Sequence, residues 1–280
     1  MSDNELYVKA FAKINLFLHV LGKNDRGYHL LDSLFVFADI GDDIVISRND
    51  SEKITVTAYG EFGNDIPTDD SNLVVKAAHT FGVFKGLNIK LTKNVPVSSG
   101  IGGGSADAGA VIRGLIKMNN LQLSENEITR KATSVGADVP ACVYSKSCRI
   151  GGIGEQIEPF SIGEKFKVLL INPLRKIMTK DIFGIGVKKF SMKADIDKNN
   201  LALSLKNTRN DLVEPASQLV PEIKDIIISL SKTKDCVFSG MSGSGATCFA
   251  LYSTSDDLKT AEAALRRQYK DYWIKTGNIL

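Results

Sequence analysis

The amino-acid sequence predicts an α+β protein built from two domains. Its 280 residues are enough for one large or two medium hydrophobic cores. Strand-like alternation dominates residues 5–59, and helical periodicity follows it. The second half has the order strand, helix, strand, strand, helix, strand. Because glycines and Pro159 interrupt the periodicity between Gly151 and Gly163, we place the domains at residues 1–155 and 156–280.

The first half begins with strands and continues with helices. A further alternating segment, residues 87–91, predicts a strand, and the glycine-rich segment after it leads into a helix with one apolar face. Helical periodicity also starts near Leu73, after a cap at Asp70 or Ser71. Ser124 and Glu127 form a capping-box pattern for a helix that ends near Gly136. The early strands are predicted at 7–21, 33–38, 43–47 and 53–58, with turns at Gly22, Asp25–Gly27 and Gly41–Asp42.

The second half contains two amphipathic helices, at residues 221–231 and 257–267. Each lies between strand-like segments, so the order of elements resembles a ferredoxin-like arrangement. The strands are predicted at 167–171, 236–238, 248–252 and 273–275.

Composition narrows the function. Hydrophobic residues make up 43% and charged residues 24% of the chain, which is typical of a globular protein and not of a disordered chain or coiled coil. The formal charge is only +3, and the short pairs Lys188–Lys189 and Arg266–Arg267 are typical of solvated helix faces. We therefore expect no nucleic-acid partner.

The cysteines and the N-terminus indicate the compartment. Four cysteines and three histidines lack the spacing of a structural zinc site, and we expect reduced thiols. The first five residues are acidic and without an apolar core, so no secretory signal is expected. No apolar run reaches the length of a membrane span. These features predict a cytoplasmic protein that does not bind membranes.

The most informative segment is Pro96–Ala110, in which four glycines stand within five residues. Glycines accept positive φ and leave backbone N–H groups accessible, and a following helix adds its positive end, so the segment predicts a phosphate-binding loop. It lacks the lysine of a P-loop and the third glycine of a dinucleotide fingerprint. Taken alone, it is also compatible with a flexible turn between a strand and a helix.

With two other segments, this loop carries a resemblance to a known family. Pro96–Ala110 resembles the ATP-binding signature of the GHMP kinases, and Ala12–Leu16 and Gly240–Ala246 resemble the family's first and third motifs in the expected order. The similarity extends from about residue 8 to the C-terminus, and Gly27–His29 and Gly136–Pro140 are similar to one group within the family. Departures occur at Ser98 and Ser99, which affect the entry to the loop, and at Gly109 in the helix.

The resemblance implies a fold, a reaction and cofactors. The fold is the two-domain GHMP kinase fold, with an N-terminal ribosomal-protein-S5-like domain, a C-terminal ferredoxin-like domain and the active site between them. The reaction is phosphorylation of the 2-hydroxyl of a small molecule, cytidine diphosphate methylerythritol, with ATP and Mg²⁺, in isoprenoid precursor synthesis. We expect a monomer or a homodimer.

Other functions are compatible with the same resemblance. A kinase acting on mevalonate, homoserine or a sugar is the first alternative. A non-catalytic ATP-sensing module and a decarboxylase of the same fold are the others. Product analysis separates the decarboxylase from the kinases.

Two residues are candidates for catalysis. Phosphoryl transfer requires mainly positioning and charge compensation. By the resemblance, Asp138 takes or orients the proton of the substrate hydroxyl; as an isolated residue it is also typical of a turn. Lys13 lies in a largely apolar strand, where its charge needs a partner, and pairing with Asp138 would satisfy both groups. Alternatively, Lys13 is an edge-strand lysine that reaches solvent.

The nucleotide site is predicted at the glycine loop and two flanking residues. Ser105 is expected to ligate Mg²⁺ or the β-phosphate, or else only to cap the helix that it opens. The resemblance places Asn72 and Lys93 near the adenosine. The loop residues are Pro96, Gly100, Ile101, Gly102, Gly103, Gly104, Ser105 and Ala106.

The predicted substrate site combines a strand position, an aromatic cluster and a turn. Asn15 shares a strand face with Lys13. Tyr28 and His29 are expected to stack on a pyrimidine and read its edge, although without the resemblance Tyr28 suits a core position. By the resemblance, Phe183 supplies the second stacking surface and Thr179 a further contact. Gly243 and Ser244 are expected to reach the substrate through backbone N–H groups, unless the turn is a plain hairpin loop.

Overall fold

A computed structural model describes residues 5–280. Residues 1–4, which carry most of the prediction that no secretory signal is present, lie outside the described part. Two compact units are present, and each is described by itself. The first contains residues 5–12, 41–97 and 102–145; the second contains residues 13–40, 98–101 and 146–280. The strands β1 (Glu5–Lys23) and β2 (His29–Arg48) contribute residues to both. These units are discontinuous in sequence, whereas the predicted domains 1–155 and 156–280 are continuous; that division stays a prediction.

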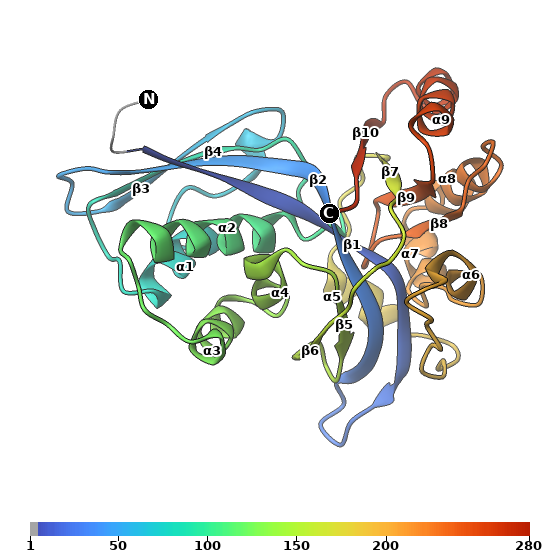
Figure 1. The fold of residues 1–280 in the computed structure, drawn as a ribbon, viewed down its shortest axis with the longest axis horizontal. Coiled ribbons are helices and arrows are strands. Elements are labelled where there is room, and N and C mark those ends of the chain that lie inside the picture. Colours follow the sequence, from blue (N-terminus) through green and yellow to red (C-terminus); the bar gives the residue numbers. More distant parts are fainter. Residues whose placement is uncertain (1–4) are drawn as a thin grey trace. The chain divides into compact units, whose positions relative to one another are not determined.

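In the first unit, helices pack on one face of a sheet (Figure 1). β4 pairs in parallel with β3 and antiparallel with the second half of β2. Burial alternates along β3 and β4, as expected for strands with one face on a core. The elements are β3 (Ile54–Tyr59), a 3₁₀ helix (Gly63–Asp65), α1 (Leu73–Thr80), β4 (Leu87–Thr92), α2 (Gly103–Met118), α3 (Glu125–Val135) and α4 (Val139–Tyr144).

Two of the predicted turns lie inside strands instead. Gly22 belongs to β1, which extends to Lys23. Gly41 and Asp42 lie inside β2, which is continuous from His29 to Arg48. A Cβ on Gly41 would stand 1.8 Å from the Ala10 carbonyl oxygen, so glycine is required here for the close approach of β1. Asp42 is fully buried and accepts the N–H groups of Asn94 and Val95 at 2.6 and 3.1 Å. Tertiary contacts therefore explain two residues whose types are typical of turns.

The helix ends of this unit test the capping predictions. The capping box of Ser124 and Glu127 is confirmed, and α3 ends at Val135 with Gly136 as its C-cap, near the predicted end. The predicted cap of α1 is wrong: Asn72, and not Asp70 or Ser71, accepts the N–H of Val74 at 3.0 Å. Asp69 instead binds the N–H of Ser71 in a local turn.

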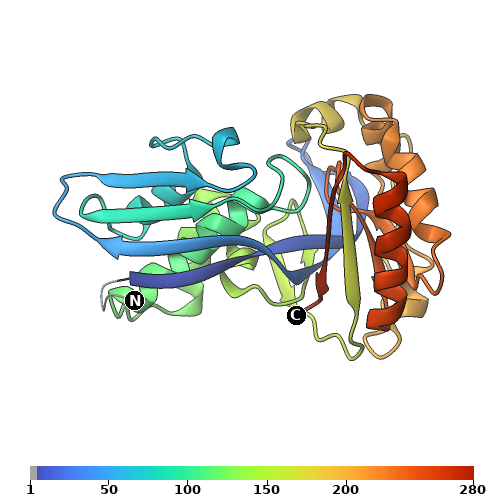
Figure 2. The ribbon, with the colours of Figure 1, turned by 90° about the horizontal axis from the view of Figure 1, so that it is seen from above.

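The second unit contains a four-stranded antiparallel sheet in the order β10-β7-β9-β8. Figure 2 shows α9 lying along this sheet, and its buried Leu258, Ala261 and Leu265 join the core beneath. The predicted strand and helix order is confirmed. The elements are β7 (Lys167–Asn172), α8 (Glu222–Ser231), β8 (Phe238–Met241), β9 (Cys248–Tyr252), α9 (Ser255–Gln268) and β10 (Trp273–Asn278).

Five short elements of this unit were not predicted. β5 (Cys148–Gly151) and β6 (Gln156–Pro159) form a hairpin next to β2. Three helices precede α8: α5 (Thr179–Ile185), α6 (Leu201–Leu205) and α7 (Val213–Leu219). Each spans about two turns or fewer, which is too short for periodicity to identify. None of the helices within residues 5–280 has both the length and the apolar character needed to cross a bilayer.

Candidate functional site

Lys13 and Asn15 lie side by side on one face of β1. Both are buried, with exposed fractions of 4% and 2%. The Lys13 ammonium group donates to Asn15 Oδ1 at 2.7 Å and lies 4.3 Å from the centre of the Phe35 ring. Asn15 Nδ2 donates in turn to the Ser33 hydroxyl at 2.9 Å. Lys13 is therefore not an edge lysine that reaches solvent, and its charge is held beside the predicted substrate residue Asn15.

The first part of the glycine loop is joined to β1 and to the turn after β8 by main-chain hydrogen bonds. The N–H of Lys13 donates to the Ile101 carbonyl at 3.0 Å, and the N–H of Thr247 donates to the Ser99 carbonyl at 3.1 Å. The Ser242 hydroxyl accepts the N–H of Asn15 at 3.0 Å and donates to the Gly100 carbonyl at 2.9 Å. Parts of all three sequence motifs thus meet within the second unit.

Glycine is required where these segments touch. Gly100 has φ +79°, and a Cβ there would lie 2.3 Å from the Ser242 carbonyl oxygen. Gly243 has φ +55°, and its Cβ would lie 2.7 Å from the Gly100 carbonyl oxygen. Larger residues at either position would separate the two backbones.

The second part of the loop opens α2. Gly102 adopts a left-handed conformation at the N-cap, where it has no side chain to cap the helix, and the first helical bond runs from the Ala106 N–H to the Gly102 carbonyl at 2.8 Å. The N–H groups of the first turn therefore have no hydrogen-bond acceptor within the helix. This is the geometry of an anion-binding helix terminus.

Ser105 does not head the helix as predicted. α2 begins at Gly103, so Ser105 is its third residue, and its hydroxyl makes no capping bond. Within residues 5–280 that hydroxyl has no hydrogen-bond partner. A half-buried hydroxyl that makes no hydrogen bond to the described residues and lies beside first-turn N–H groups is suited to bind Mg²⁺ or a phosphate oxygen. Mg²⁺ bound with nucleotide phosphates uses only one or two protein ligands.

A buried ion cluster lies behind this helix start. The Lys93 ammonium group donates to Asp107 at 2.7 Å and also to Asp42, and all three side chains are almost completely buried. Burial lowers the pKa of Lys93, but Asp107 and Asp42 outweigh it and the pKa is raised. Burial raises the pKa of Asp107 to about 7, against the opposing charge of Lys93. A Cβ on Gly103 would lie 3.4 Å from Lys93 Nζ, so the cluster supports the loop from inside.

The two residues predicted near the adenosine have structural contacts here. Asn72 caps α1 and donates from Nδ2 to the Pro67 carbonyl at 2.6 Å. Lys93 forms ion pairs with Asp42 and Asp107 in the buried cluster. Pro96 and Ala106 are buried on either side of the loop. Contact of any of these residues with a nucleotide stays a prediction.

Asp138 occupies the N-cap position of α4 and is half-buried. Its carbonyl accepts the N–H of Cys142 at 3.1 Å. The other end of α4 is held by Arg113, which donates to the carbonyls of Cys142 and Val143 at 2.7 and 3.1 Å. Asp138 belongs to the first unit and Lys13 to the second, and their predicted pairing stays a prediction.

The predicted aromatic site is partly assembled. His29 and Phe183 stack with ring centres 4.8 Å apart and an angle of 29° between the rings. Burial, and then the charge of Lys23, lower the pKa of His29, which favours the neutral ring at pH 7. Tyr28 is 58% exposed, so it is not a core anchor and is free to stack on a ligand. The Thr179 and Ser244 hydroxyls are 3.0 Å apart, within hydrogen-bonding distance.

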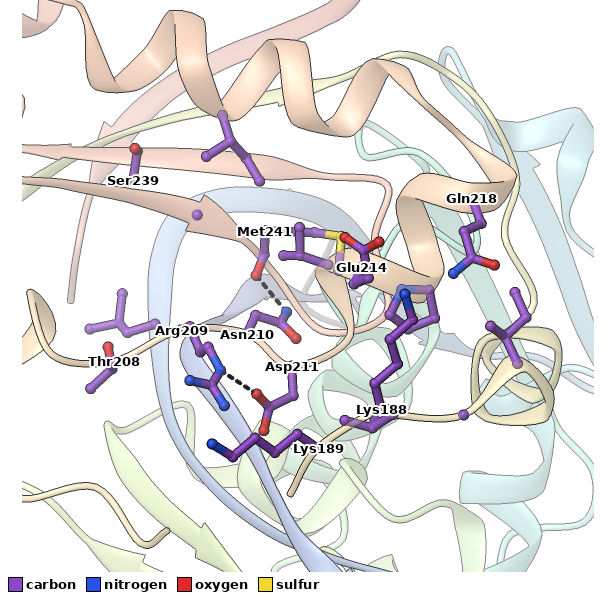
Figure 3. Close-up of a pocket in the computed structure, with 18 of the residues that line it drawn as sticks. Lys188, Lys189, Thr208, Arg209, Asn210, Asp211, Glu214, Gln218, Ser239 and Met241 are labelled. Atoms are coloured by element: carbon purple, nitrogen blue, oxygen red, sulfur yellow. Dashed lines mark hydrogen bonds and ion pairs between the residues drawn. The ribbon is translucent and has the colours of Figure 1, made fainter. Parts of the chain in front are cut away.

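Sequence reasoning did not identify a cavity of about 620 Å³ in the second unit (Figure 3). None of the predicted site residues lines it. One of its walls is the segment Thr208–Asp211, in which Arg209 forms an ion pair with Asp211 at 2.6 Å and Asn210 donates to the Met241 carbonyl at 2.8 Å. Asn210 was missed because no periodicity or motif marks it; its position beside the third motif depends on tertiary structure.

Family models match both halves of the chain. The model described as "GHMP kinases N terminal domain" matches residues 72–146, and the model "GHMP kinases C terminal" matches residues 192–271. The first covers the glycine loop and Asp138, and the second covers the turn after β8.

Full-length relatives and solved structures agree with the models. The chain is 40% identical to the 4-diphosphocytidyl-2-C-methyl-D-erythritol kinase of Paramagnetospirillum magneticum, with 98% of each chain covered. It is 39% identical to the enzyme of that name from Ruegeria pomeroyi, with 98% of this chain and 99% of the relative covered. A crystal structure of 4-(cytidine 5'-diphospho)-2C-methyl-D-erythritol kinase matches with a TM-score of 0.80 and 26% identity over 98% of this chain and 99% of the other. Homoserine kinase from Cytophaga hutchinsonii shares the fold, with a TM-score of 0.72 and 18% identity over 99% of this chain and 96% of the other.

Proposed function

Because the chain belongs to the GHMP kinase family, in the group of 4-diphosphocytidyl-2-C-methyl-D-erythritol kinases, we propose that it phosphorylates the 2-hydroxyl of 4-diphosphocytidyl-2-C-methyl-D-erythritol. ATP is the phosphoryl donor, as the family implies. The product is a precursor for isoprenoid synthesis by the methylerythritol phosphate route, and the enzyme acts in the cytoplasm.

The observation that carries this proposal is the meeting of the three motifs. The Ser242 hydroxyl joins Asn15 of the first motif to Gly100 of the glycine loop, so the residues proposed for substrate and for phosphate are held in one hydrogen-bonded arrangement. A phosphotransferase needs such fixed geometry more than it needs covalent chemistry.

Residues of both units have roles in the proposed reaction. The N–H groups at the start of α2 bind phosphate oxygens of ATP. Asp138 takes or orients the proton of the 2-hydroxyl, and the buried Lys13 supplies positive charge for the transition state. When bound, Mg²⁺ neutralises phosphate charge, and Ser105 is the residue proposed to hold it.

Recognition of the cytidine is assigned to the aromatic residues. The stacked pair of His29 and Phe183 and the exposed Tyr28 present ring faces to a pyrimidine. Because the lowered pKa of His29 favours a neutral ring, that ring has one donor and one acceptor for the edge of the base.

The proposal is tested by a coupled ADP-release assay with four acceptors: 4-diphosphocytidyl-2-C-methyl-D-erythritol, mevalonate, homoserine and galactose. We expect turnover only with the cytidylated acceptor, and mass spectrometry of the product should locate the phosphate on the 2-hydroxyl. Turnover of another acceptor in preference would reject the proposed substrate while retaining kinase activity. ATP binding without turnover of any of the four would favour a nucleotide-sensing role.

A further inference from the structure

Asn210 is a buried side chain that uses all its hydrogen-bonding groups on the backbone around the third motif. Its Nδ2 donates to the carbonyls of Met241 and Gly243, both at 2.8 Å, and its Oδ1 accepts the N–H of Leu212 at 2.9 Å. Only 9% of the residue is exposed. Figure 3 shows the bond to Met241 beside the cavity wall.

The backbone of Asn210 is itself fixed. The N–H of Leu18 donates to the Arg209 carbonyl at 3.1 Å, and the N–H of Asp211 donates to the Leu18 carbonyl at 2.8 Å. The Asp211 carboxylate also accepts the N–H of Val20 at 2.8 Å. The segment therefore runs along β1 like a short extra strand, and Asn210 has a rigid base from which to hold the loop.

The bonds of Asn210 determine which way two peptide groups face. In a planar trans peptide, the carbonyl of one residue and the N–H of the next point in opposite directions. With the carbonyls of Met241 and Gly243 directed to Asn210, the N–H groups of Ser242 and Ser244 are directed away from it. The Ser242 N–H donates to the Thr247 carbonyl at 2.9 Å. Within residues 5–280, no acceptor takes the N–H of Ser244.

We infer that Asn210 is a positioning residue: by holding the carbonyls of Met241 and Gly243, it presents the N–H of Ser244 as a donor to the substrate. This inference rests on the proposed function and on the expectation that Ser244 reaches the substrate through its backbone N–H group. The contact of the Ser244 hydroxyl with Thr179 puts a second polar group beside that N–H, so both can bind an oxygen-rich ligand. Asn210 acts through the loop and does not touch the substrate itself.

The decisive variants are Asn210→Ala and Asn210→Asp, with Asn207→Ala as a control at an exposed asparagine three residues earlier in the chain. For Asn210→Ala we expect the KM for the cytidylated substrate to rise by about 10-fold or more, with the KM for ATP within about twofold of wild type. A KM for substrate that does not change, or an equal rise for both substrates, would overturn the inference. Asn207→Ala should match wild type.

Asn210→Asp provides a test that general loss of structure would not reproduce. Its carboxylate cannot donate to the two carbonyls, but a protonated carboxyl can donate to one. Burial favours the protonated form, so the activity of this variant relative to wild type should rise as the pH falls from 8 to 6. If the ratio of variant to wild-type activity does not change with pH, the inference is contradicted. This test can be applied even if Asn210→Ala does not fold.

A measurement without substrate separates this inference from the proposed function. NMR amide exchange should show a protected Ser242 N–H in the wild-type protein and faster exchange at Ser242 in Asn210→Ala than in Asn207→Ala. If the wild type turns over none of the acceptors but this difference is seen, the proposed function fails and the role of Asn210 in orienting the loop stands. If turnover is observed and Ser242 exchanges equally in both variants, the inference fails alone.

Discussion

The backbone N–H of Asn15 donates to the hydroxyl of Ser242 at 3.0 Å, across a separation of 227 residues. The same hydroxyl donates to the Gly100 carbonyl, so one serine joins three segments that are far apart in the sequence. Close contact of these backbones depends on glycine at positions 100 and 243. The packing of these segments and their proposed role in the reaction therefore depend on the same contacts. Single substitutions can test stability and turnover separately.

Gly100→Ala should destabilise the protein more than Gly82→Ala does. Both glycines have positive φ, +79° and +84°, and an alanine at either pays a backbone strain of about 1–2 kcal/mol. Only at Gly100 would the new Cβ also collide with the Ser242 and Gly245 backbones, because nothing lies within 4 Å at Gly82. Overpacking adds about 1–3 kcal/mol. Urea unfolding of the two variants measures the difference, and equal losses would show that the contact is not tight.

Asp138→Asn should reduce kcat by about 10²–10⁴-fold, since the amide cannot accept the proton of the substrate hydroxyl. The affinity for ATP should change little, because the phosphates are assigned to the start of α2. Calorimetric titration with a non-hydrolysable ATP analogue and steady-state kinetics measure the two effects. Asp271→Asn, the same change at an exposed position, is the control; retained turnover in Asp138→Asn would remove Asp138 from its proposed role.

Phe183→Ala should weaken binding of the cytidine group. Stacking of a base on an aromatic ring contributes about 1–3 kcal/mol, so the KM for the cytidylated substrate should rise by about 5- to 150-fold, with the KM for ATP unaffected. Phe190→Ala removes a ring that is 47% exposed and that stacks on no other ring within residues 5–280, and it should have no such effect. Inhibition by cytidine diphosphate should weaken in parallel; unchanged inhibition would place the base elsewhere.

Asp107→Asn should remove a pH dependence of stability. The folded-state pKa of Asp107, about 7, exceeds its ordinary value of 3.8, so the folded protein binds this proton more tightly than the unfolded chain does. Its contribution to stability is complete below about pH 4 and is lost as the pH rises through 7, with a slope of at most about 1.4 kcal/mol per pH unit. Unfolding free energies from pH 4 to 8 should fall less steeply in the variant than in wild type; identical slopes would contradict the raised pKa.

Much of the fold could be predicted because its signals are local. The capping box at Ser124 and Glu127 uses residues three positions apart, and the alternation in residues 87–91 reports one buried face. Where local chemistry allowed more than one outcome, prediction failed. Gly41 and Asp42 have the composition of a turn, yet Ala10 and the Asn94–Val95 backbone hold them in a strand.

The candidate site, too, could be predicted only in part. Its residue types were evident from the sequence, because a run of glycines before a helix and a lysine in an apolar strand each have few physical explanations. The residues that these side chains contact were not evident from the sequence. That Lys13 binds Asn15, that Lys93 lies between two buried carboxylates, and that Asn210 holds the third motif all depend on contacts between distant segments.

By itself, the sequence determined the order of strands and helices, the glycine-rich loop before a helix and the family motifs, since spacing and side-chain chemistry act over a few neighbouring residues. Only the tertiary structure decided which backbone groups are hydrogen-bonded to which others. The reason is that a hydrogen bond depends on position and direction in space, and the chain sets these only when segments such as Asn15, Gly100 and Ser242 pack together.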